Sequence, residues 1–186
     1  WPDNTDRIIL DEVDSTMAEA ARRAPDLMRP TWIMAHRQTA ARGRRGRTWS
    51  TPDGSFAATF IMKPGGNPAS AARRAFMAAN ALFEALALHV DRNALSLKWP
   101  NDVLLNDGKV AGILLESAGR AGGEVDWLSI GIGVNLRGVP EGLNRTDFPP
   151  VSLEGEGGER IDNHTLLSEL ASNMATEEKV FAEFGF

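Results

Sequence analysis

The apolar residues of this 186-residue chain recur at two spacings, and each spacing predicts a different kind of element. Runs rich in β-branched and aromatic residues predict strands. We expect these strands over residues 8–10, 31–37, 55–62, 95–99 and 127–136. Apolar positions that recur every three or four residues predict helices. We expect these helices over residues 17–23, 67–89 and 164–182.

Local signals refine the boundaries of these elements. Two apolar runs within residues 103–117 meet across the Asn-Asp-Gly turn at 106–108, which predicts a β-hairpin. Thr16 and Glu19 have the spacing of a capping box, so we expect the first helix to begin at about Met17. Strands outnumber helices and do not alternate with them strictly. This order predicts an α+β fold with a mixed, largely antiparallel sheet flanked by helices.

Composition restricts the class of protein further. Apolar residues make up 42% and charged residues 24% of the chain, as in globular proteins, and its length suits one domain. No apolar run approaches the roughly 18 residues of a membrane span, and the first residues lack a signal-peptide pattern. Absence of cysteine excludes disulfides and cysteine nucleophiles and fits a reducing cytoplasm. The three histidines are too far apart for a local metal motif, although folding could unite them.

Positive charge is concentrated in residues 38–49, although the chain carries a net charge of −5. Arg42, Arg44, Arg45 and Arg47 fall within six consecutive positions, and glycines occupy the other two. Two such charges at ~4 Å repel by roughly 4 kcal/mol at an effective dielectric near 20, so the cluster favours a counter-anion. The segment is either a solvated loop or an anion clamp that orders around its ligand, and the small spacers favour the clamp. Net acidity argues against general nucleic-acid binding.

Two further groups of polar residues lie at predicted element boundaries. Asn101 and Asp102 follow a strand, where they form a plain turn or face a ligand. Lys109 begins an apolar strand, so its ammonium group either reaches back to water or points into a cleft. Ser15 and Thr16 begin a helix, where they act as caps or offer donors to a polar ligand. Sequence alone leaves these alternatives open.

Taken together, the motifs resemble a known family. The sequences DST, RGRRGRTW, KWPNDV followed by GKVAGIL, and IGIGVNL closely resemble the catalytic domain of biotin protein ligases, over nearly the whole chain from Ile8. The resemblance implies a fold similar to the cores of class II aminoacyl-tRNA synthetases. It implies that biotin and MgATP give biotinyl-5′-AMP, which a lysine of a biotin carboxyl carrier protein then attacks. The resemblance allows a homodimer. From the chain itself we expect no DNA partner and no membrane partner.

The resemblance assigns roles to individual residues. Lys109 and Arg44 are the expected catalytic residues, with Lys109 between the biotin carboxylate and the α-phosphate. The expected biotin-binding residues are Ser15, Thr16, Met17, Gln38, Arg42, Gly43, Arg44, Lys109 and Gly112. The expected ATP- and adenylate-binding residues are Arg42, Arg44, Arg45, Arg47, Trp49, Asn101, Asp102 and Asn135. We expect no metal cage made by the protein alone; Mg²⁺ would arrive with ATP, near Asp102. Gly112, Gly131 and Gly133 would leave room for the ligand.

The chain also departs from the family pattern. Met17 stands where the family commonly has asparagine, and Ala41 replaces the first glycine of the arginine segment. Many family members carry an N-terminal DNA-binding domain and a C-terminal β-barrel. We expect residues 1–186 to be the catalytic domain, with the DNA-binding domain absent and the barrel absent, disordered or truncated. The competing interpretations are a lipoate ligase or octanoyltransferase of the same fold, and a biotin-binding module without catalysis.

Overall fold

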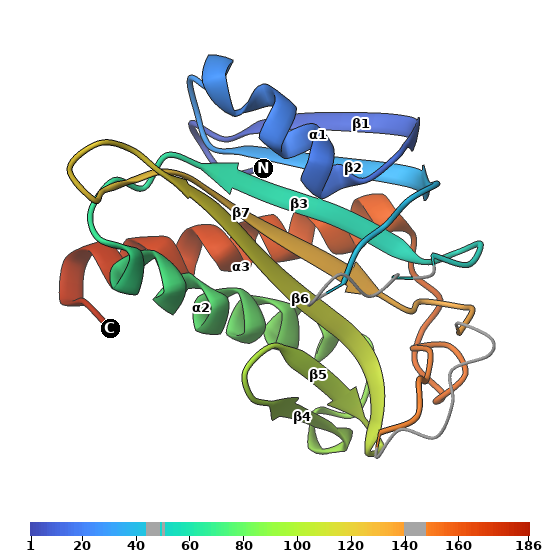
Figure 1. Ribbon diagram of the computed structural model, residues 1–186. Helices are drawn as coiled ribbons and strands as arrows, with labels where there is room; N and C mark the ends of the chain where they lie inside the picture. Colours follow the sequence, from blue (N-terminus) through green and yellow to red (C-terminus); the bar gives the residue numbers. More distant parts are fainter. Residues whose placement is uncertain (44–48, 50, 140–147) are drawn as a thin grey trace.

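A computed structural model describes residues 1–43, 49, 51–139 and 148–186 (Figure 1). The strands are β1 (Asp6–Val13), β2 (Thr31–Gln38), β3 (Phe56–Met62), β4 (Leu95–Lys98), β5 (Asp102–Leu105), β6 (Gly108–Gly119) and β7 (Val125–Val134). The helices are α1 (Thr16–Arg23), α2 (Pro68–Leu86) and α3 (Asn163–Phe184), with short 3-10 helices η1 (Ala24–Asp26) and η3 (Arg92–Ala94). Each strand and helix that the sequence predicts is present.

The strands form one seven-stranded sheet in the order β1-β2-β3-β7-β6-β5-β4. Among the strand pairs in the described residues, β1 and β2 are parallel and the others are antiparallel. The predicted mixed, largely antiparallel sheet is therefore confirmed. Within it, β6 and β7 are paired so that Gly112 lies opposite Gly133 and Leu114 lies opposite Gly131. This register places three glycines close together in the middle of the sheet.

Helices cover both faces of the sheet (Figure 1). Alternate residues of β2 point to opposite faces. Trp32 belongs to the large core under α2 and α3, where its ring stacks on Phe60 at a centroid distance of 4.9 Å. Ile33 belongs to a smaller core under α1 with Ala20 and Ile61. Burial on both faces explains why residues 56–62 are apolar except for Thr59.

Turn and cap residues set the limits of two elements as predicted. Asn67 caps α2, because its side chain accepts a hydrogen bond from the Ser70 N–H, and Pro68 occupies the first helical position. In the β5–β6 hairpin, Asn106 and Asp107 both have positive φ angles, of 48° and 62°. That backbone conformation is typical of a type I′ turn, which matches the right-handed twist of the two strands.

The capping box predicted at the start of α1 is wrong. Thr16 is already a helical residue, and Ser15 is the N-cap, with φ −157° and ψ 135° and no side-chain capping bond. The Thr16 hydroxyl donates instead to Gln38 on β2, and Glu19 pairs with Arg22 and Arg23. The side chains that the local pattern assigned to a cap thus form other bonds, and the partner of Thr16 lies in a distant segment of the chain. No helix in the described part of the chain is long and apolar enough to cross a membrane.

Candidate active site

Glycines of β6 and β7 form the floor of the candidate site. A Cβ atom on Gly133 would lie 2.8 Å from Nε1 of Trp49, and one on Gly112 would lie 3.2 Å from Cζ3 of the same ring. A Cβ atom on Gly131 would lie 2.7 Å from Sδ of Met17. The expectation that these glycines leave room for a ligand stays a prediction. The approaching groups are the side chains of Trp49 and Met17, which rest directly on the sheet backbone.

The Lys109 side chain lies against this floor and is partly exposed. Its Nζ lies 2.8 Å from Oδ1 of Asp102 and 5.4 Å from the centroid of the Trp49 ring. Its Cε would lie 3.4 Å from a Cβ atom on Gly112. Lys98 approaches the other oxygen of Asp102 at 4.0 Å. One carboxylate thus lies between two ammonium groups at the end of the glycine floor.

A buried polar cluster lies where α1, β2 and β3 meet. The Thr16 N–H and hydroxyl donate to Oε1 of Gln38 at 2.8 and 3.1 Å. The Thr59 hydroxyl donates to the Thr16 hydroxyl at 2.8 Å. Ser15 is buried beside them, with its N–H bonded to Asp14. The structure thus brings together Ser15, Thr16 and Gln38, as predicted. Sequence reasoning missed Thr59, although a threonine within a wholly apolar strand was a usable signal.

The described part of the arginine segment also reaches the sheet. Nη2 of Arg42 lies 3.5 Å from Oε2 of Glu116 on β6. Sequence reasoning missed Glu116, because nothing local links it to a residue 74 positions away. Gly43 follows Arg42, whereas Arg44, Arg45 and Arg47 lie outside the described residues. The predicted arginine clamp therefore stays a prediction, and Arg42 is paired here with the carboxylate of Glu116.

Asn101 and Asn135 lie close to Lys109, but their side-chain amides also bind the backbone. Nδ2 of Asn101 donates to the Ile113 carbonyl at 2.8 Å, and Nδ2 of Asn135 donates to the Val151 carbonyl at 3.0 Å. Oδ1 of Asn135 is buried and has no hydrogen-bond partner within the described residues.

Metal-binding side chains are sparse. The fold brings His36 and His164 together, with ring centroids 5.6 Å apart. In the residues that the structure describes, however, no three histidine, aspartate or glutamate side chains are grouped so as to hold a metal ion. Asp102, next to Lys109, is the carboxylate nearest the glycine floor that could meet a cation carried by a ligand.

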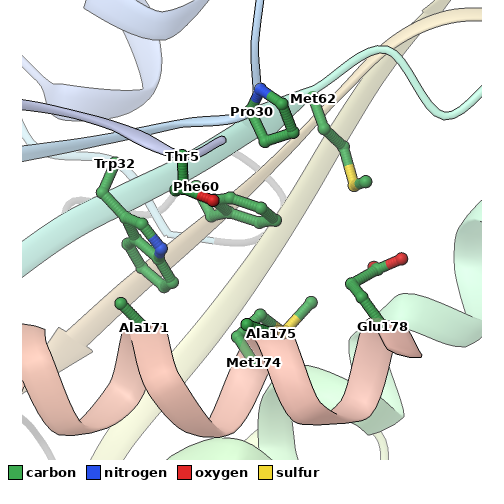
Figure 2. A pocket seen from close by; sticks show the side chains of 9 residues that line it. All are labelled: Thr5, Pro30, Trp32, Phe60, Met62, Ala171, Met174, Ala175 and Glu178. Carbon is green, nitrogen blue, oxygen red and sulfur yellow. The ribbon is translucent and has the colours of Figure 1, made fainter. Parts of the chain in front are cut away.

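A separate hollow of about 180 Å³ lies on the opposite face of the sheet (Figure 2). In Figure 2, Trp32, Phe60 and Met62 project from the sheet toward Ala171 and Met174 of α3. Its ionisable lining residue is Glu178, which already forms an ion pair with Arg74, with Nε and Oε1 2.7 Å apart. None of the predicted site residues lines this hollow. The candidate active site is therefore assigned to the face that carries α1.

The fold and the site together define a class of protein. Cationic groups at one end of a glycine floor and a buried hydrogen-bonding cluster at the other suit a ligand with an anionic end and a polar head. The chain belongs to the biotin/lipoate A/B protein ligase family, whose sequence model matches residues 9–135.

Individual relatives agree with this assignment. The chain is 46% identical to a biotin–[acetyl-CoA-carboxylase] ligase from Paracoccus denitrificans, over 96% of this chain and 75% of that protein. It is 28% identical to the biotin protein ligase from Aquifex aeolicus in complex with biotin and ATP, with a TM-score of 0.74 over 96% of this chain and 72% of the other. It is 26% identical to the biotin protein ligase from Leishmania major in complex with biotinyl-5-AMP, with a TM-score of 0.73 over 96% of this chain and 76% of the other.

The relatives named bifunctional ligase/repressor are longer. This chain spans about half of their length. The part of this chain that matches these relatives contains the glycine floor, Lys109 and the Thr16 cluster.

Proposed function

We infer that the protein is an ATP-dependent, AMP-forming biotin ligase that activates biotin as biotinyl-5′-AMP. It then passes the biotinyl group to a lysine of a biotin carboxyl carrier protein. The observation that carries this inference is the position of Lys109, whose Nζ lies beside Trp49 and Asp102 over the glycine floor. The 46% identity to a biotin–[acetyl-CoA-carboxylase] ligase supports biotin as the substrate.

Cationic groups would reduce the repulsion between the two anionic substrates in the first step. An oxygen of the biotin carboxylate attacks the α-phosphorus of ATP, a P–O bond to pyrophosphate breaks, and two anions must approach each other. Each 1.36 kcal/mol of uncompensated repulsion slows the reaction tenfold. Lys109 would neutralise part of this charge by position alone, as electrostatic catalysis requires. Arg42, which pairs with Glu116, is assigned to the phosphates by resemblance. Arg44 is assigned the same role by resemblance.

The distance between the two ends of the site suits biotin. Gly131 lies at the Thr16 end and Gly133 under Trp49, two residues further along β7. Two residues of a strand span roughly 7 Å. A ligand that lies along this floor, beside the Met17 and Trp49 side chains that rest on the two glycines, would place a polar ring near Thr16 and Gln38 and its carboxylate near Lys109. In the second step the acceptor lysine attacks the acyl carbon, an amide forms, and AMP leaves.

Magnesium and the partner proteins complete the proposal. Mg²⁺ is commonly held by one or two carboxylates together with substrate phosphates, so Asp102 and the ATP phosphates would suffice. Biotinyl transfer requires a biotin carboxyl carrier protein as acceptor. A cytoplasmic location fits the use of ATP and the absence of cysteine. A homodimer and the absence of DNA binding remain predictions.

Lys109→Ala tests the proposal. The protein is incubated with MgATP, a biotin carboxyl carrier domain and either biotin, lipoate or octanoate, and both ATP–pyrophosphate exchange and acceptor labelling are measured. The wild type should require biotin for exchange and should label the carrier domain. The variant should lose at least a hundredfold in exchange while still binding biotin, because it lacks the charge that unites the two anions. Exchange driven by lipoate, or full exchange by the variant, would refute the assignment.

A further inference from the structure

The orientation of the Gln38 side-chain amide is fixed by the first residue of α1. Both the backbone N–H and the hydroxyl of Thr16 donate to Oε1 of Gln38, at 2.8 and 3.1 Å. A backbone N–H can only donate, so the amide atom that faces it must be the oxygen. Nε2, with its two donors, lies on the other side of the amide. No acceptor in the described part of the chain takes a hydrogen bond from it.

Thr59 fixes the Thr16 hydroxyl in turn. Because the Gln38 oxygen can only accept, the Thr16 hydroxyl must use its proton there. The Thr16 oxygen then accepts a hydrogen bond from the Thr59 hydroxyl, 2.8 Å away. Thr59 is fully buried in β3, opposite Gly131, so it cannot readily exchange this bond for one to water. The three side chains form a chain of hydrogen bonds in which Thr59 donates to Thr16 and Thr16 donates to Gln38.

This direction determines which atoms are left for a ligand. The Thr16 oxygen has used one of its two lone pairs, so one acceptor site remains. The Gln38 Nε2 group offers donors beside it. An acceptor next to a donor complements the adjacent N–H and C=O groups of a cyclic urea. The dithiolane ring of lipoate and the hydrocarbon chain of octanoate have neither group and cannot satisfy it.

We propose that Thr59 is a positioning residue that helps to select the ureido head of biotin by holding the Thr16 hydroxyl beside Gln38. This inference rests on the proposed function and adds to it a source of specificity in β3. Thr59 itself does not touch the ligand. Loss of its hydroxyl removes one of the two hydrogen bonds that hold the Thr16 hydroxyl, so the donor and acceptor pattern is held less firmly before the ligand arrives.

Thr59→Val and Thr59→Ser test the proposal as a matched pair. Valine has the shape of threonine without the hydroxyl, and serine retains the hydroxyl without the methyl group. Biotin affinity is measured by calorimetry, and the KM for biotin, the KM for ATP and kcat by ATP–pyrophosphate exchange. Thr59→Val should weaken biotin about five- to tenfold in both Kd and KM, the value of one net hydrogen bond. The KM for ATP and kcat should not change, and Thr59→Ser should stay within about twofold of the wild type.

A double-mutant cycle shows whether Thr59 acts through Thr16. Thr16→Val combined with Thr59→Val should weaken biotin no more than Thr16→Val alone. Additive losses, equal losses in the valine and serine variants, or unchanged biotin affinity would overturn the inference while leaving the ligase assignment intact. A wild type without biotin-dependent exchange would overturn both. If Thr59→Val does not fold, Thr59→Ala removes the same hydroxyl without added bulk, and the same expectations apply.

Discussion

The positions of individual side chains in the site are set by the groups that they contact. Lys109 has a carboxylate at 2.8 Å and an aromatic ring at 5.4 Å, so its ammonium group is held in place before any substrate arrives. Asp102 occupies the position on Lys109 that a substrate carboxylate or phosphate would compete for. Trp49, whose neighbours in the arginine segment lie outside the described residues, packs on the floor that the ligand would cover. Small changes in this floor should therefore affect both Trp49 and catalysis.

Alanine substitutions in the floor should have graded effects. A Cβ atom at Gly133 would lie 2.8 Å from the indole of Trp49, whereas one at Gly112 would lie 3.2 Å away. Gly133→Ala should therefore displace the indole more than Gly112→Ala, with a stability cost of about 1–3 kcal/mol for such overpacking. Gly119→Ala is the matched control on β6, because its nearest neighbour would be 3.6 Å away. Urea denaturation and ATP–pyrophosphate exchange measure the effects, and equal values for all three variants would contradict the packing described.

At the scale of elements, the start of α1 carries the residues that are assigned to the biotin head. Asp14 immediately precedes them. The Arg22 guanidinium and the Ser15 N–H both donate to its carboxylate. These bonds lower the pKa of Asp14 to about 2, with the Arg22 hydrogen bond as the larger cause. The Asp14 carbonyl also accepts the N–H of Ala40, which ties the helix start to the segment after β2.

Asp14→Asn should reveal this contribution through its pH dependence. A depressed pKa means that the carboxylate stabilises the folded state above its ordinary pKa of 3.8 and loses that effect as pH falls through about 2. The variant should be less stable than the wild type at pH 6, by less than about 1 kcal/mol because the pair is exposed. The difference should vanish near pH 2. Asp11→Asn is the control, and a difference that persists in acid would refute the explanation.

At the scale of the whole molecule, local patterns predicted the elements, and long-range contacts decided the site. The strands, helices and hairpin turn followed from apolar spacing and turn residues, which act over a few positions. The partners of Thr16 and Arg42 could not be predicted in this way. Thr59 lies 43 positions from Thr16 and Glu116 lies 74 positions from Arg42, so only the folded sheet brings them together. The capping box failed for the same reason, since Gln38 took the Thr16 hydroxyl that the local pattern assigned to a cap.

One sheet connects both ends of the site, so ligand binding should stabilise the molecule as a single unit. Biotin at about 100 times its Kd adds about 2.7 kcal/mol to the stability of a protein that binds it only when folded. For a chain of this length that corresponds to roughly 5–10 °C in Tm. Biotin with MgATP should raise the Tm further, because under the proposed function the adenylate would contact both the Thr16 cluster and Lys109.

Lys109→Ala separates the two contributions. The variant should keep most of the rise in Tm caused by biotin alone, because Thr16, Gln38 and Thr59 are intact, and should lose the additional rise caused by MgATP. Thr59→Val should show the reverse, with a smaller biotin effect at fixed concentration and an additional adenylate effect that remains at saturating biotin. Differential scanning calorimetry at matched ligand concentrations measures both. Parallel losses in the two variants would mean that the head and the carboxylate of the ligand are not bound by separate ends of the floor.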